Sequence, residues 1–225
     1  MINQNNKLLE FPTRIVAILA HEDDEIACGG LLSKNVRLGG MSHVICFGGS
    51  SKKRKEEFNR SCETLGVSFE CLGKKELEYN KDFVRTISYL SKKIAQLKPD
   101  FVVTHRENND YHKDHRDVSK IAREIIIRAQ TSVDGHISKG ILYSETISLH
   151  SIVNLFVDIT QEYDKVVRAL NFHKSQVEKL EGYYVQELDS KTKIRGVQTG
   201  CERAEAFSFE PLPLIGGLNR RNVGI

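Results

Sequence analysis

Two short stretches hold the side chains best suited to catalysis. The first is His21-Glu22-Asp23-Asp24-Glu25, and the second, roughly ninety residues later, is His112-Lys113-Asp114-His115. Imidazole nitrogens and carboxylate oxygens are the ligands of catalytic zinc sites, which combine three such side chains with one open position. A cation bound there lowers the pKa of a water ligand and polarises a carbonyl, which is the chemistry that amide hydrolysis needs.

Spacing suggests a role for each member of these stretches. His21 and Asp24 are three residues apart on a turn, so both can face one centre, and His115 completes a three-ligand set. Asp23 adjoins a ligand but points elsewhere, which suits a general base that takes a proton from water. His112 lies three residues before His115, where it can protonate the leaving amine or stabilise the oxyanion.

The remaining acids have catalytic and structural interpretations. Asp114 is expected to fix the tautomer of His112 and to stabilise its charged form. The alternative for Asp23, Asp24 and Glu25 is that they cap the following helix and complement its dipole. Because both stretches lie in loops that follow expected strands, we favour the catalytic interpretation.

Alternating strands and helices are expected to position both stretches. Apolar runs of strand length alternate with helical segments, which is typical of a mostly parallel α/β sheet flanked by helices. Ligands bind such sheets outside the carboxyl ends of the strands, and both stretches follow expected strands. The expected strands are 14–20, 42–47, 67–72 and 100–104, and the helices are 26–38, 53–65, 81–97 and one that ends near 128.

The pattern is weaker after residue 130. We expect a single domain over 1–225, with a lead-in at 1–13 and an extended tail at 209–225. The strand-like segments here are 141–143, 147–150 and 151–158, and 163–172 is expected to be a helix.

Composition indicates an ordinary globular protein. Hydrophobic residues make up 40% and charged residues 28% of the chain, and the net charge of +3 is too small to indicate nucleic-acid binding. The five scattered cysteines contain no C-x-x-C pair, which predicts free thiols in a reducing compartment. Because the sequence has no signal region and no bilayer-length apolar stretch, we expect a cytoplasmic protein without membrane insertion.

The two stretches also carry a family resemblance. Residues 20–25 with Gly29-Gly30 resemble the A-H-P-D-D-E…G-G signature of the LmbE-like (PIG-L) family of zinc-dependent N-acetylglucosaminyl deacetylases. Residues 109–115 resemble its H-P-D-H motif, His173-Lys174-Ser175-Gln176 its H-x-S-Q, and 195–207 its R-G…A-E-A-F ending. The likeness covers about residues 14–208.

The resemblance implies a Rossmann-like α/β fold and removal of an acetyl group from an N-acetylated amino sugar. It implies one Zn²⁺ per chain, with Fe²⁺ as the alternative metal. It assigns the same ligands, base and acid as the reasoning from the residues, and it places substrate contacts at Arg54 and His173. The expected partner is a small-molecule amino sugar, and a homo-oligomer is compatible with the sequence.

Two features modify this expectation. Arg54 belongs to a basic run at 51–55, which is either a solvated helix start or an anion site that favours a conjugate such as a sugar nucleotide. Glu22 and Lys113 stand where the family has prolines. Losing a proline relaxes φ and restores an N–H, so each loop is expected to be less preorganised, and Glu22 adds negative charge beside the metal.

Other functions remain as alternatives. One is an amidase of the same family that acts on a thiol conjugate or an antibiotic intermediate, and another is a non-catalytic sugar- or metal-binding relative. A nucleotide-binding Rossmann protein is disfavoured because no G-x-G-x-x-G follows the first strand.

Overall fold

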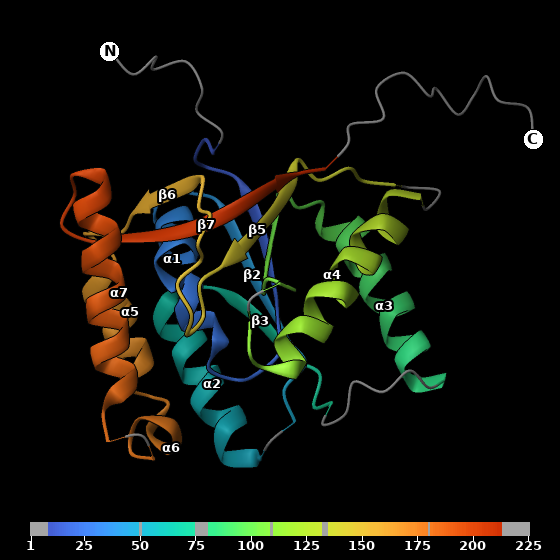
Figure 1. The fold of residues 1–225 in the computed structure, drawn as a ribbon. Helices are drawn as coiled ribbons and strands as arrows, with labels where there is room; N and C mark the ends of the chain where they lie inside the picture. The colour runs from blue at the N-terminus through green and yellow to red at the C-terminus, as the bar shows by residue number, and fades with distance from the viewer. Residues whose placement is uncertain are drawn as a thin grey trace, which may run out of the picture.

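A seven-stranded mixed sheet forms the centre of the molecule (Figure 1). The computed structural model describes residues 9–49, 51–74, 81–108, 110–131, 135–179 and 181–212. Five strands are parallel in the order β3-β2-β1-β4-β5, and β7 joins β5 and β6 in antiparallel pairing. The strands are β1 (Arg14–Leu19), β2 (Met41–Cys46), β3 (Ser68–Cys71), β4 (Phe101–Thr104), β5 (Gly140–Ser144), β6 (Leu155–Asp158) and β7 (Ala204–Pro211).

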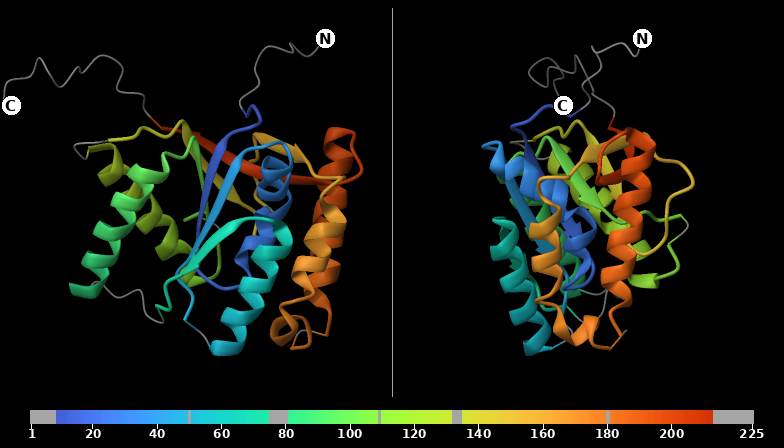
Figure 2. Two further views of the ribbon diagram at one scale, coloured as in Figure 1. Left: turned by 180° about the vertical axis from the view of Figure 1, so that it is seen from behind. Right: turned by 90° about the vertical axis from the view of Figure 1, so that its left-hand side faces the viewer.

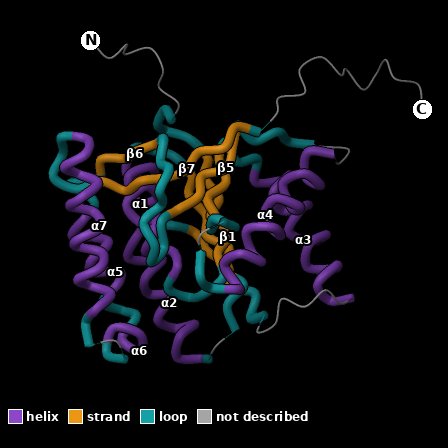
Figure 3. Tube along the Cα trace, in the orientation of Figure 1, coloured by secondary structure: helices purple, strands orange, loops and turns teal. Residues whose placement is uncertain are grey.

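Helices cover both faces of the sheet (Figures 2 and 3). One face carries α1 (Gly29–Arg37), α2 (Lys52–Leu65), α5 (Tyr163–Leu170) and α7 (Tyr183–Thr199), and the other carries α3 (Lys81–Leu97) and α4 (Lys113–Thr131). The 3₁₀ helix η1 (Asp24–Cys28) precedes α1, and the short α6 (Lys174–Val177) lies between α5 and α7.

The alternation of side chains along β1 explains why both layers are needed. Ile15, Ala17 and Leu19 pack in the core under α1, α2 and α5, whereas Val16 and Ile18 pack in the core under α3 and α4. Successive side chains of a strand point to opposite faces, so a fully apolar strand requires a layer on each side. The expected Rossmann-like α/β fold is confirmed, as are the four strand–helix pairs up to α4, within a few residues.

Two expectations in the second half were wrong. Residues 147–150 are irregular, because the Glu145 carboxylate accepts the backbone N–H of His150 and folds this segment back on itself. Residues 209–211 belong to β7, paired with β5, rather than to an extended tail. The tail from 213 onward and the lead-in up to residue 8 lie outside the described residues. Within the described ranges, no helix has the length and apolar composition to span a bilayer.

Candidate active site

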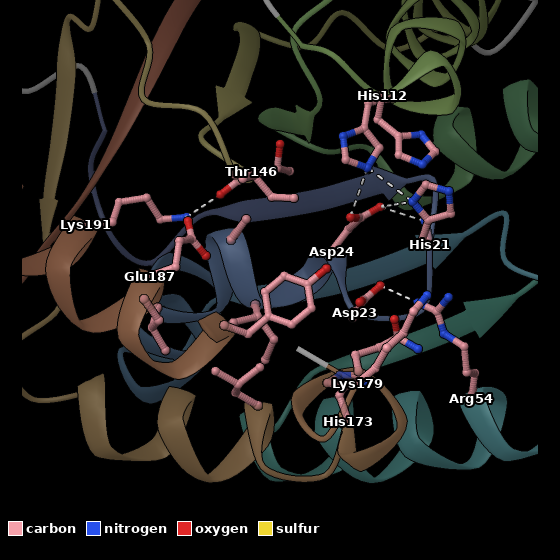
Figure 4. A pocket seen from close by; sticks show the side chains of 18 of the residues that line it. His21, Asp23, Asp24, Arg54, His112, Thr146, His173, Lys179, Glu187 and Lys191 are labelled. Carbon is pink, nitrogen blue, oxygen red and sulfur yellow. Dashed lines mark hydrogen bonds and ion pairs between the residues drawn. The ribbon is translucent and has the colours of Figure 1, made fainter. Parts of the chain in front are cut away.

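The pairing of β1 with β4 brings the two sequence motifs together. The strands are parallel neighbours, so the segments that follow them meet at the same edge of the sheet. His21 follows β1 and Asp24 opens η1, whereas His112 and His115 lie at the start of α4. Figure 4 shows His21, Asp24 and His112 converging at one end of a pocket.

Three side chains at this edge have polar atoms with the spacing of metal ligands. His21 Nδ1 lies 3.1 Å from His115 Nε2, His115 Nε2 lies 3.2 Å from Asp24 Oδ1, and His21 Nδ1 lies 3.5 Å from Asp24 Oδ2. Ligand atoms bound tetrahedrally at about 2.0–2.1 Å from a zinc ion are about 3.3 Å apart. Two imidazoles and a carboxylate at these distances are therefore suitable in type and spacing for a zinc ion.

Each of the two histidines has a carboxylate on its other ring nitrogen. Asp110 Oδ2 lies 2.8 Å from His115 Nδ1, and Asp114 Oδ2 lies 3.1 Å from His21 Nε2. Such contacts hold the proton on the outer nitrogen and leave the inner lone pair for a metal. Sequence reasoning gave Asp110 no role, although it lies within the second motif.

The side chain of Asp114 lies closer to His21 than to His112, the partner expected from the sequence. Its Oδ2 atom is 3.9 Å from His112 Nδ1, whereas the backbone N–H of Asp114 donates to that nitrogen at 3.3 Å. With Nδ1 as an acceptor, neutral His112 carries its proton on Nε2. Position 114 thus sets this tautomer through its main chain, because its N–H lies in the first turn of α4 and is free of an intrahelical acceptor.

Sequence reasoning also missed His105. This buried residue directly follows β4, as His21 follows β1, and its ring stacks on His115 with centroids 4.0 Å apart. Its Nε2 atom accepts the backbone N–H of Ala20 at 3.0 Å and lies 3.2 Å from Asp24 Oδ2. His105 therefore packs against His115 and ties this part of the site to the backbone after β1.

Charge in the cluster shifts several pKa values. Although burial opposes the shift, Asp24 raises the pKa of His21 to about 9 and, with Asp110, that of His115 to about 10. A metal must therefore displace protons from these rings, so metal affinity is expected to fall in acid. Burial and the neighbouring Asp24 raise the pKa of Asp23 to about 6, against the opposing charge of Arg54.

Asp23 is directed away from the three ligand atoms. Its Oδ1 atom accepts a hydrogen bond from Arg54 Nη2 at 2.5 Å, and it makes no helix-capping hydrogen bond. The fully buried Glu22 accepts the backbone N–H of Gly49 at 2.9 Å, and its Oε2 atom lies 3.6 Å from Arg54 Nε. The capping alternative for Asp23 therefore does not describe this site.

The second half of the chain forms one wall of the pocket next to the metal-ligand cluster. The volume of the pocket is about 260 Å³, and Figure 4 shows Glu187, Lys191 and Thr146 at the end opposite His21. Lys191 donates to the carbonyl oxygens of Glu145 and Thr146 and to Glu187 Oε1 at 2.8 Å, so its ammonium group is fully used. The apolar part of the wall comprises Ile26, Ala27, Ile147, Leu170 and Leu188.

The two predicted substrate contacts, Arg54 and His173, both line this pocket. His173 is buried and its Nε2 atom lies 2.6 Å from Glu25 Oε1, which also accepts the Ser61 hydroxyl at 2.5 Å. The lysines of the basic run at 51–55 are exposed and are not among the residues that line the pocket, so an anion site built from Arg54 with one of them stays a prediction.

Comparison with known proteins agrees with this architecture. The model of the PIG-L family, described as GlcNAc-PI de-N-acetylase, matches residues 16–126, which include every metal-ligand candidate. The chain belongs to the PIG-L family. In this PIG-L protein, the matched region runs from β1 into α4, whereas α6 and α7, which contribute to the pocket wall, lie beyond it.

Solved structures share the fold of this PIG-L protein at low sequence identity. The conserved protein TT1542 from Thermus thermophilus superposes with a TM-score of 0.77 at 20% identity, covering 92% of this chain and 98% of that one. The 4-carboxy-2-hydroxymuconate hydratase GalB from Pseudomonas putida gives 0.74 at 22%, covering 91% and 98%. The N,N'-diacetylchitobiose deacetylase from Pyrococcus horikoshii gives 0.71 at 22%, covering 88% and 84%. Among curated proteins there is no match.

Proposed function

We propose that this protein is a zinc-dependent hydrolase that removes the acetyl group from an N-acetylated amino sugar. The observation that carries the proposal is the group of His21 Nδ1, the Asp24 carboxylate and His115 Nε2, whose pairwise separations of 3.1 to 3.5 Å match those of zinc ligands. The description of the PIG-L family as a de-N-acetylase supports the same chemistry.

The chain supplies a base and an oxyanion donor on either side of the ligand set. A bound zinc ion would activate water and polarise the amide carbonyl. Asp23, with a pKa near 6, is ionised at neutral pH and is basic enough to take a proton from water. Burial and the neighbouring His21 and His115 keep the pKa of His112 below its usual value, so it is neutral at rest.

Neutral His112 is better suited to one of its two predicted roles. Because its Nδ1 atom accepts the N–H of Asp114, its Nε2–H is left to donate to the developing oxyanion. The proton for the leaving amine then comes from Asp23, which has just received one from water. We therefore favour oxyanion stabilisation over the general-acid role for His112.

The pocket favours a small substrate. Its volume of about 260 Å³ lies just below the usual range for small-molecule sites of about 300–1,000 Å³. One N-acetylated sugar residue is a reasonable occupant, with the rest of a conjugate projecting outward. The deacetylation of N,N'-diacetylchitobiose by the protein from Pyrococcus horikoshii supports an amino-sugar amide as the target.

Metal content and acetate release test the proposal together. Purified protein should contain one zinc or iron ion per chain, and it should release acetate from N-acetylglucosamine or its conjugates, with loss of activity in chelator and recovery with zinc. Because the fold also occurs in a hydratase, addition of water to an unsaturated carboxylic acid is assayed in parallel. Metal-loaded protein that releases no acetate, or that only hydrates, would refute the assignment.

Only the substrate distinguishes the alternative amidase from the proposed deacetylase. Its metal centre, base and oxyanion donor would be the same, so a panel that adds N-acyl thiol conjugates and N-acetylated glycopeptide intermediates distinguishes it. A non-catalytic relative would bind metal or sugar and turn over no member of the panel.

A further inference from the structure

Arg54 lies between two consecutive carboxylates, one of which replaces the proline of the family motif. Its Nη2 atom donates to Asp23 Oδ1 at 2.5 Å, and its Nε atom lies 3.6 Å from Glu22 Oε2. The exposed fraction of the Arg54 side chain is 17%, against 14% for Asp23 and none for Glu22. One cation therefore faces two anions in a largely dehydrated space, where charges interact strongly.

The position of Glu22 is fixed independently of Arg54. Its Oε1 atom accepts the backbone N–H of Gly49 at 2.9 Å, which ties the loop after β2 to the loop after β1. The backbone N–H of Gly48 donates to the carbonyl of Ala20 at 2.9 Å and reinforces this junction. A proline at position 22 would provide neither the carboxylate nor its charge.

We propose that Glu22 is a specificity-determining residue that neutralises Arg54, so that the pocket wall at Arg54 accepts an uncharged part of the substrate. In this arrangement Arg54 positions Asp23 and does not bind a phosphate or carboxylate. Because two carboxylates face the one guanidinium group, Arg54 offers an anion no net attraction at this wall. The proposal rests on the proposed deacetylase function and specifies its substrate class as a neutral N-acetylated amino sugar near Arg54.

The effect of Lys179 on anionic substrates must be distinguished from that of Glu22. Lys179 is exposed, lines the same pocket, and comes from the turn after α6, as Figure 4 shows. An anionic group could be accepted there instead, at the outer rim. A variant of Lys179 therefore belongs in the test beside variants of Glu22.

The test compares neutral and anionic substrates of one sugar. Acetate release is measured with N-acetylglucosamine and with its 1-phosphate and 6-phosphate, using wild-type protein, Glu22→Gln, Glu22→Pro and Lys179→Gln. Glu56→Gln is the matched control, because Glu56 is an exposed residue on α2 whose nearest cation is Lys52 at 3.8 Å. The quantity compared is kcat/KM for each phosphate divided by kcat/KM for the neutral sugar.

Wild-type protein should favour the neutral sugar. Glu22→Gln keeps the hydrogen bond to Gly49 and removes one negative charge, so the ratio for at least one phosphate should rise about tenfold, equivalent to about 1.4 kcal/mol. Glu22→Pro should change the ratio in the same direction, whereas Glu56→Gln should leave it unchanged.

Two results would overturn the proposal: a wild-type preference for a phosphate, or a ratio that responds to Lys179→Gln and not to either Glu22 variant. If no variant releases acetate, the deacetylase assignment fails separately, and calorimetric binding of the same three sugars still measures the effect of Glu22. Equal binding of neutral and anionic sugars to wild-type protein and Glu22→Gln, or no binding at all, would then overturn it.

Discussion

Replacing Asp110 by asparagine should weaken metal binding without touching a ligand. Asp110 Oδ2 accepts from His115 Nδ1 at 2.8 Å and from the Thr146 hydroxyl at 3.1 Å, and its Oδ1 atom accepts the backbone N–H of His112 at 2.9 Å. All three neighbours are donors, which a carboxylate satisfies completely. An asparagine has only one acceptor oxygen, so its NH₂ group must face at least one of these donors.

The amide is expected to turn its NH₂ group toward His115. Its oxygen then keeps the contact with the backbone N–H of His112. The ring of His115 loses the acceptor for its Nδ1–H and shifts the proton to Nε2. That nitrogen faces Asp24 and His21, where a metal would bind. A lost charge-assisted hydrogen bond costs about 1.5–3 kcal/mol, and lost carboxylate partners of metal-bound histidines reduce affinity about 10–100-fold. Thr146→Val removes the hydrogen bond that an uncharged hydroxyl donates to the same carboxylate. Because His115 keeps its acceptor in this variant, zinc affinity should fall only about 2–10-fold.

Zinc affinity is measured by competition with a chromophoric chelator, which needs no substrate. Asp117→Asn is the control, because Asp117 lies on the same helix and pairs with Lys113 at 2.7 Å on the exposed side. It makes the same change in charge and should alter affinity less than about twofold. Unchanged zinc affinity in Asp110→Asn, with normal folding, would refute the tautomer argument.

Three further substitutions probe the same region. Asp23→Asn should lower acetate release by about 10²–10⁴-fold and leave zinc affinity within a few-fold, whereas parallel losses would make Asp23 a structural residue. Gly30→Ala should destabilise the fold by about 1–3 kcal/mol in chemical denaturation, because its Cβ would lie 2.6 Å from Ile159 Cγ2; unchanged stability would contradict this packing. Burial raises the pKa of Glu205 to about 7, although it accepts the backbone N–H groups of Gly30 and Leu31. The contribution of Glu205 to the free energy of unfolding is therefore complete below about pH 4.5, and about 3 kcal/mol of it is lost as pH rises to about 7. Chemical denaturation of wild-type protein and of Glu205→Gln across this range should show that difference in pH dependence.

The sequence was most informative where local pattern decides structure. Apolar runs ended by glycines predicted the strands and helices up to α4, and because parallel strands align their carboxyl ends, the same pattern brought His21, Asp24 and His115 together. Residues 147–150 were mispredicted because a buried contact of Glu145 overrides their apolar character.

Side-chain contacts that depend on the local backbone geometry of a loop or turn could not be predicted from the sequence. Asp114 was expected to contact His112, but α4 starts at residue 113 and turns the carboxylate toward His21. His105 has no motif around it, and only its position directly after β4 would have indicated that it belongs to the site. The contact of Arg54 with Asp23 depends on how α2 packs beside η1, which residue spacing does not encode.

The pocket wall formed by α6, α7 and the segment after β5 has a consequence for how the chain can be modified. The ligand atoms and their carboxylate partners all come from residues 21–115, whereas Thr146, Lys179 and Glu187 belong to the later part. The metal-ligand candidates thus come from the earlier stretch, whereas the pocket wall takes residues from both, with Arg54 from the earlier one. Exchange of the later stretch between relatives should therefore transfer only the part of the substrate preference that α6, α7 and the segment after β5 set, with the metal-ligand residues and the proposed effect of Glu22 retained by the recipient.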